Sequence, residues 1–126
     1  MTDDWKSKYD DVDSFYEGLA YVKLNGQWGF VDRQGNVVVP LMYDDTEFFS
    51  EGLAQVRLGD GETGKYGFVD KTGKEVIPLM YDWVAWFFSG GLAEVKLNGK
   101  IGYVDKTGHE YWDMTEDEAR QKIQNR

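Results

Sequence analysis

The sequence of 126 residues contains no cysteine, one histidine and two prolines. Without cysteine the chain forms no disulfide, iron–sulfur cluster or catalytic thiol, and most structural zinc sites are excluded as well. No apolar run approaches the length needed to cross a membrane, and the N-terminus is acidic where a signal peptide needs a basic start. We therefore expect a cytoplasmic protein or an excised domain.

Positive charge is also scarce, since 14 lysines and arginines face 23 acids for a net charge of −9. This balance argues against a nucleic-acid partner and against an anionic membrane surface. The acids crowd residues 3–17 and 44–51, whereas residues 82–90 keep only Asp82. They are either solvated loops that keep a small protein soluble or a docking surface for a cationic partner.

What the chain does contain is an internal sequence repeat with three copies. The first signature has the form Gly-Leu-Ala-x-Val-Lys/Arg-Leu and occurs at residues 18–24, 52–58 and 91–97. A second, of the form aromatic/Ile-Gly-Phe/Tyr-Val-Asp, follows at residues 28–32, 66–70 and 101–105. A third, Val/Ile-Pro-Leu-Met-Tyr-Asp, closes the unit twice, at residues 39–44 and 77–82. We expect one domain over residues 1–126, with tandem units at about 9–42, 43–80 and 81–113.

Within each unit the alternation of apolar residues is typical of strands, with an Ala-Val-Leu face toward the core and Tyr21, Gln55 or Glu94 toward solvent. Asn-Gly pairs predict tight hairpin turns after the first strand. The glycine at the centre of each second strand, as in Gly29, predicts a ring from a neighbouring unit lying over it. Pro40 and Pro78 are expected to stop the third strand, since proline has no N–H for the ladder.

Each unit opens with a connecting segment, and the three segments are called the first (residues 9–15), second (43–49) and third (81–88) connections. At the end of the chain Thr115 and Glu118 form a capping-box signature that predicts a short helix at about 115–124. Trp5 precedes the first connection as Val39 precedes the second, so it can stand in for the missing apolar residue of a third strand. The predicted fold is all-β: three tandem units of about three antiparallel strands, either an open array or a barrel-like closed sheet, with the helix as a cap.

The three signatures together resemble the WG-repeat family, also called KWG repeats. The resemblance covers about residues 9–113, although only Trp28 keeps the namesake tryptophan, which Tyr66 and Ile101 replace. It implies a β-rich, largely bacterial repeat module with a binding or scaffold role and no catalytic residue to transfer.

We expect no enzyme, cofactor or metal site. The recurring Asp32, Asp70 and Asp105 are explained by turn chemistry, because aspartate commonly opens a turn that glycine closes. The single histidine, His109, occupies an exposed turn position. The loop from Asp60 to Gly64 lacks the alternating acids of a calcium loop.

The third connection is the most unusual segment, because Trp83-Val84-Ala85-Trp86-Phe87-Phe88 replaces the acidic Asp45-Thr46-Glu47-Phe48-Phe49 of the second. In one interpretation these rings pack beneath the C-terminal helix and Trp112. In the other they form an exposed platform, because exposed apolar patches are often interfaces. The candidate binding residues are Trp83, Trp86 and Phe87.

The predicted function is a non-enzymatic protein-interaction or scaffold module. The alternatives are carbohydrate binding through Trp83 and Trp86, and an acidic mimic or inhibitor that docks on a basic site. A protein partner is expected and a carbohydrate is possible, with neither nucleic acid nor membrane, and the oligomeric state stays open.

Overall fold

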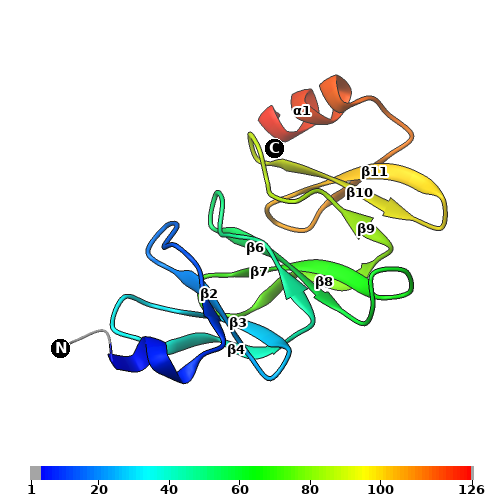
Figure 1. Ribbon diagram of the computed structural model, residues 1–126. Helices are drawn as coiled ribbons and strands as arrows, with labels where there is room; N and C mark the ends of the chain where they lie inside the picture. Colours follow the sequence, from blue (N-terminus) through cyan, green and yellow to red (C-terminus); the bar gives the residue numbers. More distant parts are fainter. Residues whose placement is uncertain (1–3, 126) are drawn as a thin grey trace.

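The computed structural model describes residues 4–125, in which the strands form three four-stranded antiparallel sheets. A 3₁₀ helix η1 (Asp4–Lys8) comes first, and the helix α1 (Glu116–Gln124) comes last. In Figure 1 the sheets follow one another along the molecule, and α1 lies beside β10 and β11 of the third sheet. Each sheet is open and separate from the others, so the described residues form a repeat array and no barrel.

The strand bounds repeat from sheet to sheet. The first sheet contains β1 (Asp11–Val12), β2 (Ala20–Leu24), β3 (Gln27–Val31) and β4 (Val37–Tyr43). The second contains β5 (Asp45–Thr46), β6 (Leu53–Leu58), β7 (Lys65–Asp70) and β8 (Glu75–Tyr81). The third contains β9 (Trp83–Val84), β10 (Leu92–Leu97), β11 (Lys100–Asp105) and β12 (Glu110–Trp112).

Each sheet has one strand more than the sequence pattern predicts. The added strand is two residues long and lies within a connection, as when Asp45 and Thr46 pair with Arg57 and Val56. A segment this short has no alternation of its own, so only its pairing with the next strand identifies it as β-structure. Among the described residues, no helix combines the length and the apolarity needed to cross a membrane.

The expectation that proline stops the third strand is wrong. β4 runs through Pro40 to Tyr43 and β8 through Pro78 to Tyr81. The pairing shifts register at this point, and proline is tolerated at such a bulge because it breaks no ladder hydrogen bond there.

The central glycines make room for this bulge, which corrects the expectation of a ring from a neighbouring unit. A Cβ on Gly29 would meet the backbone of Val39 to Leu41 in the same sheet, and Gly67 faces Ile77 and Pro78 in the same way. Only Gly102 lies under a ring, that of Trp112, which comes from its own sheet. The third sheet has no proline here and pairs Gly102 with Trp112 in regular register.

The core lies between adjacent sheets, where side chains of one sheet are buried against side chains of the next. The junction of the first two sheets buries Leu19, Phe30, Val39, Tyr43, Phe49, Ala54, Val56 and Val69. The junction of the second and third buries Leu53, Phe68, Ile77, Tyr81, Val84, Phe88, Ala93, Val95 and Val104. A repeat array is stabilised by such nearest-neighbour interfaces.

Both ends of the array are closed by parts outside the repeat. Helix α1, with Thr115 as N-cap and the capping box with Glu118, packs its buried Ala119 against Leu92 and Tyr111. At the other end the ring of Trp5 lies against Gly35, where a Cβ would collide with it. In the second sheet the equivalent Gly73 faces Val38 to Pro40 of the first sheet, so Trp5 does take the place of a preceding third strand.

Candidate functional site

The third connection divides its side chains between the core and the surface. Val84 and Phe88 are buried, and Phe88 packs edge-to-face on Phe68 with ring centroids 4.7 Å apart. The remaining large side chains face outward: Trp83 is 37% exposed, Trp86 66% and Phe87 41%. The structure therefore supports the exposed platform, and the small core beneath α1 is built by other residues.

Phe87 belongs to a row of rings that crosses all three sheets. Tyr16 stacks on Phe48 with ring centroids 4.6 Å apart, and Phe48 stacks on Phe87 at 5.6 Å. Tyr16 is 43% exposed and Phe48 is half-buried between its two neighbours. We call the surface formed by Tyr16, Phe48, Phe87, Trp86 and Trp83 the aromatic strip.

The strip is hollowed at its third-sheet end. A shallow depression of about 310 Å³ is lined by Trp83, Ala85, Trp86 and Phe87. A second hollow, of about 250 Å³, shares Ala85 and Phe87 and extends to Glu116 and Arg120 of α1. The apolar depression thus has charged groups of both signs beside it, which is the usual arrangement of a protein-binding surface with an apolar centre and a polar rim.

Sequence reasoning found three of the five residues of the aromatic strip. It identified Trp83, Trp86 and Phe87, and the structure places them together, but it missed Tyr16 and Phe48. The available signal was a second aromatic next to the last phenylalanine of each connection, as in Phe15-Tyr16 and Phe48-Phe49. Reading that signal requires the distance between neighbouring units, which the sequence alone does not provide.

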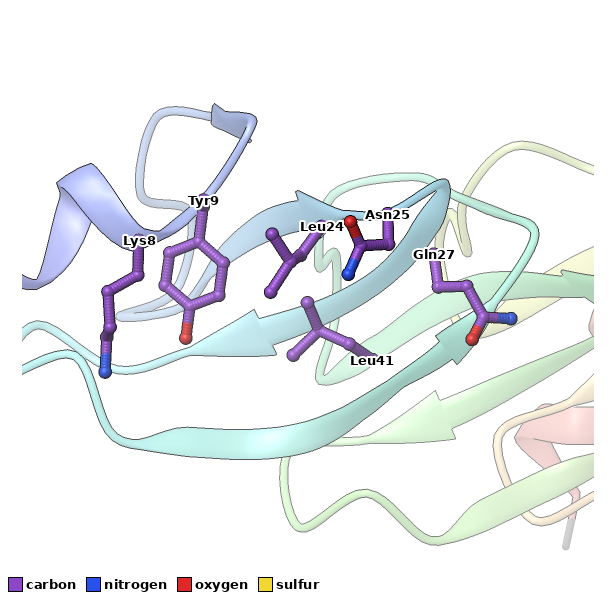
Figure 2. A pocket seen from close by; sticks show the side chains of 6 residues that line it. All are labelled: Lys8, Tyr9, Leu24, Asn25, Gln27 and Leu41. Carbon is purple, nitrogen blue, oxygen red and sulfur yellow. The ribbon is translucent and has the colours of Figure 1, made fainter.

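A third hollow, of about 370 Å³, lies at the opposite end of the array and is shown in Figure 2. Tyr9 stands between Lys8 and Leu24, with Leu41 below and Asn25 and Gln27 at the other side. The equivalent hollow recurs in the third sheet at Leu97, Asn98, Lys100, Glu110, Trp112 and Asp113. Because it follows the repeat, we attribute it to the packing of the units.

The aspartates that recur in the signatures have structural roles. The Oδ1 atom of Asp32 accepts hydrogen bonds from the N–H groups of Gln34 and Asn36, and Asp70 and Asp105 do the same in their turns. The backbone hydrogen bond from Asn36 is the main cause that lowers the pKa of Asp32. The turn chemistry predicted for these residues is confirmed.

The aspartate of each Tyr-Asp exit supports the following hairpin. Asp10 accepts from the N–H of Asn25, Asp44 from Gly59 and Asp82 from Asn98, at 2.7–2.9 Å. These three carboxylates therefore help to fix the hairpin turns of the fold. Within residues 4–125 no group of three or more histidine, aspartate and glutamate side chains is placed to hold a metal ion.

His109 is exposed in the turn after β11, with its ring 4.7 Å from that of Tyr111. Ser50 lies between the second and third sheets and donates its hydroxyl hydrogen to the carbonyl of Phe88.

One position expected to face solvent is buried instead. Gln55 is 4% exposed, and its Nε2 donates to the carbonyls of Val84 and Ala85 at 3.4 and 3.1 Å. The side chain points away from its own sheet's core and toward the next unit, a relation that strand alternation does not reveal. Gln55 thereby anchors the backbone of the third connection, which carries three residues of the aromatic strip.

Known proteins provide the remaining comparison. The sequence profile of the family described as WG containing repeat matches residues 6–28, 28–61 and 66–100. A solved structure, "Crystal structure of the tricorn protease", is similar with a TM-score of 0.47 and 20% identity; the match covers 84% of this chain but only 12% of the protease chain. No curated protein sequence matches the chain. Because the three consecutive profile matches cover well over half of its residues, this chain belongs to the WG containing repeat family.

Proposed function

We propose that this protein is a non-enzymatic protein-interaction module and that the aromatic strip is its binding surface. The observation that carries the proposal is the exposure of Trp83, Trp86 and Phe87 on one connection, continuous with rings of the other two sheets. Exposed aromatic side chains are costly to hydrate and are enriched among the residues that dominate binding energy at protein interfaces.

The partner expected from this chemistry presents an apolar surface. The depression at Trp83, Ala85, Trp86 and Phe87 is lined mainly by carbon, so an aliphatic or aromatic side chain of the partner would fill it. Arg120 and Glu116 of α1 stand beside it and would contact polar groups at the rim. Binding of this kind depends weakly on salt, because screening acts on charges and leaves apolar burial unaffected.

The test is capture of partners from a lysate of the source organism on the immobilised protein, at low and at high salt, followed by repetition with Trp86→Ala. The matched control is Met42→Ala, since Met42 is 40% exposed but lies on β4 of the first sheet. A partner that resists salt, is lost with Trp86→Ala and is kept with Met42→Ala supports the proposal. A partner that salt elutes and that ignores Trp86 would contradict it and favour acidic docking.

Carbohydrate binding is the second candidate because the indole ring of Trp86 is 66% exposed, and sugars stack on open aromatic faces. A glycan array followed by tryptophan fluorescence distinguishes the two functions. Quenching by a soluble oligosaccharide that Trp86→Ala abolishes would favour carbohydrate binding over a protein partner. The inner ring of the strip supports this alternative less, since Phe48 already stacks with Tyr16 and with Phe87.

A further inference from the structure

A two-residue turn precedes the Gly-Leu-Ala strand in every unit, and its backbone is unusual. Tyr16 pairs with Leu19 across the first turn, and the second and third turns are closed in the same way. Glu17 and Glu51 occupy the first turn position at φ of 54° and 55°. This left-handed region favours glycine, so a glutamate there is retained at a cost that its side chain must offset.

The side chain of Glu17 does so by binding the next unit. Its carboxylate accepts hydrogen bonds from the N–H groups of Glu51 and Gly52, at 2.8 and 2.9 Å, and lies 3.3 Å from the ammonium of Lys71. Partial burial alone would raise the pKa of Glu17, but the bonds from Gly52, Lys71 and Glu51 outweigh it and hold the pKa below its usual range. The second turn is therefore a receptor for a glutamate carboxylate.

The same contact recurs at the next junction. The carboxylate of Glu51 accepts from the N–H groups of Gly90 and Gly91 at 2.7 and 2.8 Å. The series then ends, because the third turn has Gly90 where the others have glutamate. A Cβ at Gly90 would lie 2.6 Å from Nη1 of Arg120, and that guanidinium donates to the carbonyls of Ser89 and Gly90 instead.

The first turn has the receptor geometry and no carboxylate on it. Within residues 4–125 the N–H groups of Glu17 and Gly18 have no hydrogen-bond acceptor. Arg33 follows Asp32 as Lys71 follows Asp70, so it has the position from which Lys71 reaches the carboxylate of Glu17. Arg33 is exposed, and its guanidinium lies over the ring of Phe15 at 4.9 Å.

We propose that the first turn, together with Arg33, is a docking site for the glutamate side chain of a partner protein. The two N–H groups of Glu17 and Gly18 would bind the carboxylate oxygens, and the guanidinium would supply charge and a further donor. Hydrogen bonds between ionised and backbone groups are shorter and stronger than neutral ones, and arginine suits a carboxylate better than lysine does. The protein already contains two glutamate carboxylates bound in this way, so we expect the first turn to bind the same group. This site does not rest on binding at the aromatic strip.

The test is an NMR titration of the ¹⁵N-labelled protein with N-acetyl-Glu-Gly-amide, at constant ionic strength, against N-acetyl-Gln-Gly-amide as the neutral control. We expect saturable shifts of the Glu17 and Gly18 amides with the glutamate compound only. The amides of Gly52 and Gly91 should stay in place, because carboxylates of the chain already occupy their turns.

Arg33→Gln should weaken this binding by about threefold, the size expected for an exposed charge pair, whereas Lys106→Gln, at the equivalent place in the third sheet, should leave it unchanged. The amide spectrum of each variant reports directly whether it is folded. Equal shifts with the glutamine compound, shifts without saturation, or an Arg33→Gln variant that binds as the wild type does would each overturn the proposal.

Discussion

Beyond the Tyr-Asp pair that opens each connection, the second has two outward acids beside Phe48, whereas the third has the outward rings of Trp83, Trp86 and Phe87. Asp45 forms an ion pair with Arg57 at 3.6 Å, and at the position equivalent to Asp45 the third connection has Trp83 beside Lys96. The next outward residue changes from Glu47 to Ala85. The surface of the connection has thus changed from charged to apolar.

The inward side chains have hardly changed. Phe49 packs on Phe30 at 4.6 Å with an interplanar angle of 68°, and Phe88 packs on Phe68 at 4.7 Å and 73°. Both connections also pair two residues with the following strand. The difference teaches that packing between sheets fixes one face of a connection and leaves the other free to acquire a function.

The largest loss of stability is expected from removing the buried phenylalanine that the two connections share. Phe49→Ala and Phe88→Ala should each lower the free energy of unfolding by about 3–5 kcal/mol, because each empties a site that is at least 98% buried between two sheets. Denaturant unfolding followed by circular dichroism measures both. Losses that differ by more than about half of this range would show that the two junctions are not equivalent.

The next largest loss of stability is expected at Gln55, whose side chain anchors the third connection. Gln55→Ala removes the hydrogen bonds to the carbonyls of Val84 and Ala85, and it should cost about 1–3 kcal/mol because buried acceptors lose their donor. Gln27→Ala is the matched control, since Gln27 is exposed and also donates to a carbonyl. Amide hydrogen exchange should become faster at Val84 and Ala85 and stay unchanged in the second connection.

The next prediction concerns the pH dependence of folding stability, to which Glu47 of the second connection contributes and the equivalent Ala85 of the third does not. Burial, and then the nearby Asp45 and Asp13, raise the pKa of Glu47, so its charged form destabilises the folded state. Stability from this group is complete below the pKa of the unfolded chain and is lost as the pH rises through the higher pKa of the folded state. Glu47→Gln should therefore stabilise the protein at pH 7 by less than about 1 kcal/mol, and the gain should vanish near pH 4. A gain that grows on acidification would contradict this assignment.

The smallest effect on stability is expected on the strip itself. Trp86→Ala should change the free energy of unfolding by no more than about 0.5 kcal/mol, since the indole is mostly in water and anchors nothing in the core. Thermal unfolding of this variant beside Phe88→Ala makes the contrast. A large loss for Trp86→Ala would mean that the ring has a structural role and would weaken the proposal for the strip.

Much of this fold follows from local patterns. The Asn25-Gly26 and Asn98-Gly99 turns, the Asp32-type turns and the capping box of α1 depend on a few neighbouring residues, and all are present. The strand alternation also placed Ala20, Val22 and their equivalents in the core correctly.

The errors arise where one unit meets another or where two strands meet out of register. Gln55 was expected at the surface, yet the next sheet covers it, and Pro40 was expected to end a strand that a bulge carries on. The row from Tyr16 through Phe48 to Phe87 joins residues more than thirty positions apart. Its spacing is set by the distance between sheets, for which a strand pattern holds no signal.

The most direct test of the aromatic strip uses the five tryptophans as reporters, since each has one indole N–H and they lie on different parts of the molecule. The ¹⁵N-labelled protein is titrated with its captured partner, and the indole resonances are followed. Our account predicts that the resonances of Trp83 and Trp86 shift or broaden while those of Trp5 and Trp28 stay in place. Shifts at Trp5 or Trp28 with Trp83 and Trp86 unmoved would contradict it and place binding at the first sheet.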